Sequence, residues 1–128
     1  MSRLEIVLPW PDKALWPNRK TGRAWQTSQK AKKEEQAWAW LATVDGRGRG
    51  EGYDPPRIGD IVVRYIGYPP SNRRWDRNGL YGALKAAEDG IAQALGCDDS
   101  RFNPVTIERG PACQGGRVIV LIGDVESD

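Results

Sequence analysis

The sequence contains no histidine, and it has only two cysteines, one methionine and one phenylalanine among its 128 residues. The absence of histidine excludes every Ser/His/Asp or Cys/His triad and removes the usual general base at neutral pH. Cys97 and Cys113 match neither a dense disulfide framework nor a zinc spacing, so we interpret both as buried thiols. Any hydrolytic chemistry must therefore come from carboxylates, lysine or a metal ion bound by oxygen ligands.

Long hydrophobic runs are also missing. Apolar segments such as 61–66 and 118–122 fall far short of the roughly 20 residues that a membrane span needs. Arg3 and Glu5 lie in an alternating pattern rather than in a basic region followed by an apolar run, so we expect no secretory signal. These observations predict a cytoplasmic protein with no membrane contact.

Length and composition predict one domain over residues 1–128, with 39% hydrophobic and 28% charged residues. The net charge of +2 hides an asymmetry along the chain. Residues 1–49 hold ten Lys or Arg against five acids, whereas residues 50–128 hold nine against twelve. The first segment is therefore the better candidate for contact with a polyanion, although this basic charge gives only sequence-independent attraction to phosphates.

Hydrophobic periodicity predicts an α+β fold, a mixed β-sheet with two main helices in the order β-α-β-α-β-β. The interval 10–27 contains two Pro, one Asn, one Gly and four Lys or Arg, and it carries Trp10, Trp16 and Trp25, so it predicts a long ordered loop. The interval 45–56 predicts a flexible connector. The expected strands are 3–8, 58–66, 105–109 and 117–122, the last two as an antiparallel hairpin, and the expected helices are 30–44, capped by Thr27 or Ser28, and 78–95, ended by Gly96.

The most informative stretch is 71–100, which reads SNRRWDRNGLYGALKAAEDGIAQALGCDDS. Asp76 stands among three arginines just before the second helix, and Asp98 and Asp99 follow its terminal glycine. A straight helix of this length separates its ends by roughly 25 Å, so these acids meet only if the helix is shorter or bent, or if a dimer joins opposite ends. In the simpler interpretation, Asp76 is an N-cap and Asp98-Asp99 is a turn.

The same stretch resembles the RusA family of Holliday-junction resolvases. The family pattern is a basic run, then Asp-x-Asp-Asn-Leu opening a helix, a helical lysine, and Asp-Asp after a glycine. In this sequence the matching residues are Arg73-Arg74, Asp76, Leu80, Lys85, Asp89-Gly90-Ile91, Ala94-Leu95-Gly96 and Asp98-Asp99, and Leu8-Pro9-Trp10-Pro11 resembles the amino-terminal strand and turn.

The resemblance implies a metal-dependent endonuclease that acts on four-way DNA junctions in recombination and repair, with a phage origin as one possibility. It places metal ligands at Asp76, Asn78 and Asp99, and an essential lysine at Lys85. Carboxylates suit Mg²⁺, with Mn²⁺ as a substitute, and such ions activate water and neutralise charge at phosphorus. The catalytic candidates are Asp76, Asn78, Lys85 and Asp99, and the DNA-binding candidates are Lys20, Arg23, Arg73, Arg74 and Arg77.

Asn78 departs from the pattern because it stands where the family has the second Asp, and Gly79 stands where the family has Asn. An amide oxygen can coordinate a cation but adds no negative charge. Three explanations stay open: a naturally weak or inactive relative, a position changed from Asp to trap DNA, or a misplaced alignment. Lys85 also has a structural alternative, an ion pair with Asp89 four residues later.

Three functions compete. The leading hypothesis is a homodimeric junction resolvase, because two strands must be cut symmetrically and a two-fold dimer supplies that symmetry. The second is a junction or structured-DNA binding protein without nuclease activity. For both, the tryptophans of the 10–27 loop would suit base stacking, although they could equally cap the core. The third is a protein-interaction domain that uses Trp38 and Trp40 of the first helix.

Overall fold

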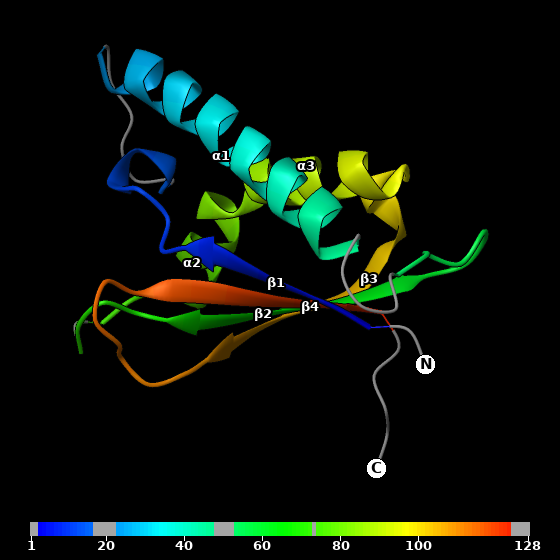
Figure 1. Ribbon diagram of the computed structural model, residues 1–128. Coiled ribbons are helices and arrows are strands. Elements are labelled where there is room, and N and C mark those ends of the chain that lie inside the picture. Colours follow the sequence, from blue (N-terminus) through cyan, green and yellow to red (C-terminus); the bar gives the residue numbers. More distant parts are fainter. Residues whose placement is uncertain (1–2, 17–22, 48–52, 73, 124–128) are drawn as a thin grey trace.

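The computed structural model describes residues 3–16, 23–47, 53–72 and 74–123, and of 23–28 it describes only the backbone. Three helices lie on one face of a four-stranded mixed sheet (Figure 1), which confirms the α+β class and the single small domain. In chain order the elements are β1 (Arg3–Pro9), the 3₁₀ turn η1 (Lys13–Leu15), α1 (Arg23–Arg47), β2 (Ile61–Tyr68), α2 (Arg77–Ala83), α3 (Lys85–Leu95), the 3₁₀ turn η2 (Asp99–Arg101), β3 (Phe102–Arg109) and β4 (Arg117–Gly123).

The strand order is β1-β4-β2-β3, with β4 antiparallel to both neighbours and β2 parallel to β3. The predicted β3–β4 hairpin is therefore wrong. A strand that returns through helices to the same sheet pairs in parallel by a right-handed crossover, and α2 and α3 supply that crossover between β2 and β3. The apolar strand β4 then takes the central place between β1 and β2, where both of its edges are hydrogen-bonded.

The helices differ from the expectation in two ways. α1 begins at Arg23, before the predicted cap at Thr27 or Ser28, and it continues through Gly46 to Arg47. The predicted helix 78–95 is two helices, because the backbone breaks at Leu84, which has φ −93° and ψ 0°. Two glycines in α2 weaken the helix just before this break. Gly96 ends α3 in the left-handed conformation, as predicted.

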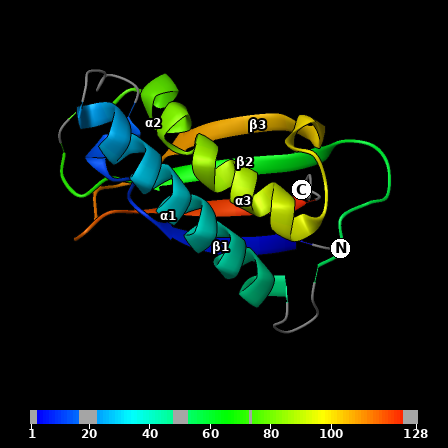
Figure 2. The ribbon, with the colours of Figure 1, turned by 90° about the horizontal axis from the view of Figure 1, so that it is seen from above.

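Alternate residues of the strands form the core beneath the helices. Leu4, Ile6 and Leu8 of β1 are buried, as their spacing predicts. α1 and α3 lie across the same sheet face (Figure 2) and approach each other closely at Gly90, where an added Cβ would lie 2.2 Å from the backbone oxygen of Gln36. The absence of a side chain at Gly90 therefore lets α1 and α3 pack backbone to backbone.

Several boundaries move relative to the sequence prediction. β2 starts at Ile61 and runs past Gly67 to Tyr68, and β3 starts three residues early, at Phe102. Tyr53, placed in the predicted connector, is only 4% exposed and belongs to the core. Both cysteines are half-buried rather than fully buried. Among the described helices, none is long and apolar enough to span a membrane.

Candidate nucleic-acid interface and acidic residues

One end of the sheet collects the aromatic residues. The register joins Pro9 to Arg117, Tyr68 to Arg117 and Gly67 to Arg109, so β1, β2 and β3 end where β4 begins. Three tryptophans pack together at this end, which we call the tryptophan end. The ring centroid of Trp10 lies 6.0 Å from that of Trp16 and 5.6 Å from that of Trp75.

The three tryptophans contact the hydrophobic core and also contribute to the protein surface. Trp10, Trp16 and Trp75 are partly buried and pack against the core. The expectation that loop tryptophans cap the core is thus confirmed for Trp10 and Trp16, whereas the side chain of Trp25 lies outside the described residues. Each of the three rings keeps part of its surface exposed, and that part is available for stacking against a ligand.

Asp76 caps the first turn of α2 at the tryptophan end. Its Oδ2 accepts a hydrogen bond from the backbone N–H of Gly79 at 3.1 Å, which confirms the N-cap interpretation. An added Cβ at Gly79 would lie 3.2 Å from two ring atoms of Trp16. The indole of Trp16 therefore occupies the space beside the position where the RusA pattern has asparagine.

Basic side chains surround this cap. Arg74 and Arg77 are exposed, and neither forms an ion pair with another described residue. Two further arginines lie at the same end, and the sequence did not single them out: Arg109 stacks on Trp75, and Arg117 stacks on Tyr68. Of the other predicted DNA contacts, Lys20, Arg73 and the side chain of Arg23 lie outside the described residues.

Asp99 lies at the opposite end of the sheet. It opens η2, three residues before Phe102, the first residue of β3. Trp75, next to Asp76, accepts a hydrogen bond through its backbone oxygen from Arg109, the last residue of β3. An eight-residue strand spans about 23 Å at roughly 3.3 Å per residue, so Asp99 and the cap of α2 at Asp76 lie near opposite ends of β3.

The acidic residues of one subunit do not fit a single Mg²⁺ centre. Among the described residues, no group of three Asp, Glu, His or Cys side chains is placed to hold a metal ion. Asp76 already uses one oxygen for its helix cap, and Asn78 contributes no charge. The bend at Leu84 thus leaves Asp76 and Asp99 near opposite ends of β3, and neither belongs to a three-ligand cluster among the described residues.

Lys85 is the first residue of α3, so it and Asn78 belong to different helices instead of sharing one helical face. Its Nζ lies 3.7 Å from Glu88 Oε1 and 5.0 Å from the ring centroid of Tyr81. The structure therefore gives Lys85 an ion pair with Glu88, three residues on, where the sequence offered Asp89 as the alternative partner. Its side chain remains more than half exposed, at 56%.

Glu88 is a buried carboxylate at the helix break. Tyr65 and Tyr81 both donate their hydroxyl groups to it, Tyr65 at 3.1 Å and Tyr81 at 3.0 Å. Burial raises the pKa of Glu88, while the two hydroxyl donors and Lys85 oppose that rise. The side chain of Glu88 is only 3% exposed, so this network links α2, α3 and β2 beneath the surface on which Lys85 stands.

Electrostatics place Asp99 near this network. A hydrogen bond with Asp98, followed by burial and the charge of Asp89, raises the pKa of Asp99, and Lys85 lowers it. Burial and Glu88 raise the pKa of Tyr81 to about 12, with a smaller contribution from Asp99. Lys85 therefore acts on the pKa of Asp99, whereas Asp76 lies at the tryptophan end.

A second buried acid, Glu35, lies on α1. It is 7% exposed, and its Oε2 has no hydrogen-bond partner among the described residues. Burial, together with the charge of Asp12, raises its pKa to about 7. Glu35 is therefore uncharged at acidic pH and gains its negative charge as the pH rises through about 7.

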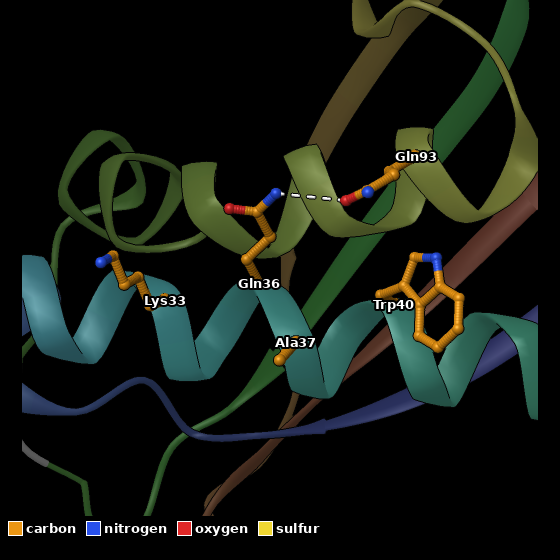
Figure 3. A pocket seen from close by; sticks show the side chains of 5 residues that line it. All are labelled: Lys33, Gln36, Ala37, Trp40 and Gln93. Atoms are coloured by element: carbon orange, nitrogen blue, oxygen red, sulfur yellow. Dashed lines mark hydrogen bonds between the residues drawn. The ribbon is translucent and has the colours of Figure 1, made fainter.

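An open pocket of about 280 Å³ lies between α1 and α3 (Figure 3). Gln36 of α1 donates a hydrogen bond across it to Gln93 of α3 at 3.3 Å. Trp40 borders this pocket, and Trp38 is 56% exposed nearby on α1. Among the described residues that line the pocket, Lys33 carries a charge and none is a carboxylate, histidine or cysteine.

Fold and surface define a small two-layer α+β protein with a basic, tryptophan-rich end. The chain belongs to the same family as an uncharacterized protein of Xylella fastidiosa. The two are 31% identical over 117 residues, which cover 91% of this chain and 74% of that protein. No protein-family model matches the chain.

The sequence reasoning missed Glu88, Tyr65 and Tyr81. A signal was available for Glu88, because it occupies a core position in the apolar series of Leu84, just before α3, and Ile91 and Leu95 of α3. A carboxylate on a buried helical face needs hydrogen-bond donors. Which residues donate depends on the packing of β2 under the helix break, and local sequence does not encode that packing.

Proposed function

We propose that this protein is a RusA-type protein that binds four-way DNA junctions as a homodimer. The observation that carries the proposal is the tryptophan end, where Trp10, Trp16 and Trp75 pack beside the exposed arginines Arg74 and Arg77. Arginines neutralise backbone phosphates and release counterions, and exposed aromatic surface stacks on unpaired bases at a branch point. The RusA resemblance supports junctions as the substrate class.

Mg²⁺-dependent cleavage of the junction is the second candidate, and the position of Lys85 favours it. Lys85 stands exposed within the electrostatic reach of Asp99, where a cation could neutralise charge on a phosphate. Mn²⁺ would be the substitute ion. Because Asp76 and Asp99 lie at opposite ends of one subunit, a centre that used both would need the second copy, and Asn78 would weaken it.

Competition binding tests the primary proposal. Fluorescence anisotropy would compare a synthetic four-way junction with a linear duplex of equal length, at moderate salt and without divalent ions. We expect preference for the junction, and we expect Arg74→Gln with Arg77→Gln to weaken binding to both DNAs. Arg57→Gln, which removes one exposed charge before β2 at the other end of the sheet, is the control. Equal affinity of the wild type for both DNAs would refute the proposal.

A further inference from the structure

The tryptophan end carries one arginine on each face of the sheet. Arg109 ends β3 in register with Gly67, whose added Cβ would meet Leu80 and Trp75 on the helix-covered face. The guanidinium carbon of Arg109 lies 4.8 Å from the ring centroid of Trp75, and its Nη2 donates to the backbone oxygen of Trp75 at 3.0 Å. Arg109 therefore lies on the helix side of the sheet.

Arg117 lies on the opposite face. The next residue, Val118, is fully buried beneath the helices, and side chains alternate along a strand, so Arg117 points away from the helices. Its guanidinium carbon lies 5.2 Å from the ring centroid of Tyr68, the residue opposite it in β2. No described helix covers this face (Figure 1).

Both guanidinium groups lie against an aromatic ring and remain accessible. Each is exposed, and within the described part of the chain neither is paired with a carboxylate. Stacking on an aromatic ring restricts the side chain but leaves N–H groups free at the guanidinium edge. Those groups match the oxygens of a phosphate, which is a strong charge-assisted partner for arginine.

We propose that the tryptophan end of the sheet enters the branch point of the DNA, with Arg109 contacting a phosphate of one arm and Arg117 a phosphate of the neighbouring arm. The two cations are separated by the thickness of the sheet and point to opposite sides. A branched DNA places backbones on both sides of such an edge, whereas a straight duplex meets one side. This inference rests on the proposed function and gives a physical reason for the expected preference for junctions over linear duplex.

The test measures the affinities of Arg109→Gln and Arg117→Gln for junction and duplex by anisotropy. Loss of one charge-assisted contact weakens binding by about tenfold, so each variant should bind the junction about tenfold more weakly. The double variant should lose about a hundredfold on the junction. On linear duplex the double variant should bind no more weakly than the worse single variant, because only one side is in contact.

Arg57→Gln removes the same charge from an exposed position before β2 and is the matched control. Arg109→Lys and Arg117→Lys keep the charge but lose the stacked, planar group, and we expect them to recover part of the affinity. The proposal that the tryptophan end enters the branch point fails if Arg109→Gln and Arg117→Gln weaken binding to duplex and junction equally. It also fails if their affinities match that of Arg57→Gln. If the wild type itself shows no preference for the junction, the proposed function fails as well.

Discussion

Tyr65 and Glu88 form a buried pair in which the tyrosine hydroxyl donates to the carboxylate at 3.1 Å. Burial, followed by the charge of Glu88 and this hydrogen bond, raises the pKa of Tyr65 well above its usual value. The raised pKa favours the protonated hydroxyl of Tyr65, which is the form that donates to Glu88. The pair connects β2 to the first turn of α3, next to the helix break at Leu84. It therefore helps to position Lys85, the first residue of α3.

Tyr65→Phe should lower the free energy of unfolding by about 1–3 kcal/mol, because it leaves a buried carboxylate with one donor fewer. Urea unfolding followed by circular dichroism gives the change. Tyr68→Phe, whose hydroxyl has no hydrogen bond to a described residue, is the control and should be nearly neutral. In a Glu88→Gln background the cost of Tyr65→Phe should shrink; an unchanged cost would mean that the hydroxyl acts independently of the carboxylate.

Glu35 should make stability depend on pH. Its pKa in the folded protein is about 7, above the usual 4.5, so its contribution to stability is complete below pH 4.5 and is lost as pH rises through 7. The loss amounts to about 3 kcal/mol at 1.36 kcal/mol per pKa unit. Glu35→Gln should therefore flatten the change in unfolding free energy between pH 5 and pH 8.

Glu34→Gln is the matched control for this prediction, because Glu34 is the neighbouring residue but is exposed. The difference between the two variants cancels the contribution of Glu88, whose pKa is also raised. Identical pH slopes for Glu35→Gln and the wild type would show that Glu35 does not titrate in this range.

Gly90→Ala should separate α1 from α3. The new Cβ would lie 2.2 Å from the backbone oxygen of Gln36, and backbone atoms cannot yield as a flexible side chain does, so we expect a cost of about 1–3 kcal/mol or more. Thermal unfolding measures it. Gln93→Ala, an exposed position on the same helix, should cost much less; equal effects would contradict the close approach of the two backbones.

Asn78→Asp should raise cleavage of synthetic junctions in Mg²⁺ or Mn²⁺ by at least about tenfold. The new carboxylate adds a negative charge that attracts the metal ion, and an attraction that lowers the activation free energy by about 1.4 kcal/mol raises the rate tenfold. Gel assays with labelled junctions provide the measurement. In that background Asp76→Asn or Asp99→Asn should abolish cutting but preserve binding, and Lys85→Ala should cut poorly. If Asn78→Asp folds, binds DNA and stays inactive, Asn78 is not the missing ligand.

Light scattering should give a mass of twice the 14.2 kDa chain, since the proposed substrate is two-fold symmetric and one subunit separates Asp76 from Asp99. A monomer mass that does not change with concentration would count against the dimer. In that case a centre containing both aspartates is also excluded.

The sequence by itself determined the local features of this protein. Alternation in 3–8 predicted the buried face of β1, and Gly96 predicted the end of α3, because strand period and the left-handed preference of glycine act over a few residues. The N-cap at Asp76 was foreseen as one of two interpretations. All of these depend on the backbone within one or two turns.

Only the tertiary structure decided the long-range features. It broke the second helix at Leu84 over the buried carboxylate of Glu88, it inserted β4 between β1 and β2, and it brought Arg109 and Arg117 to opposite faces of one end. It also separated Asp76 from Asp99. These outcomes depend on which surfaces pack together across the chain, and packing free energy is set by partners that local periodicity does not identify.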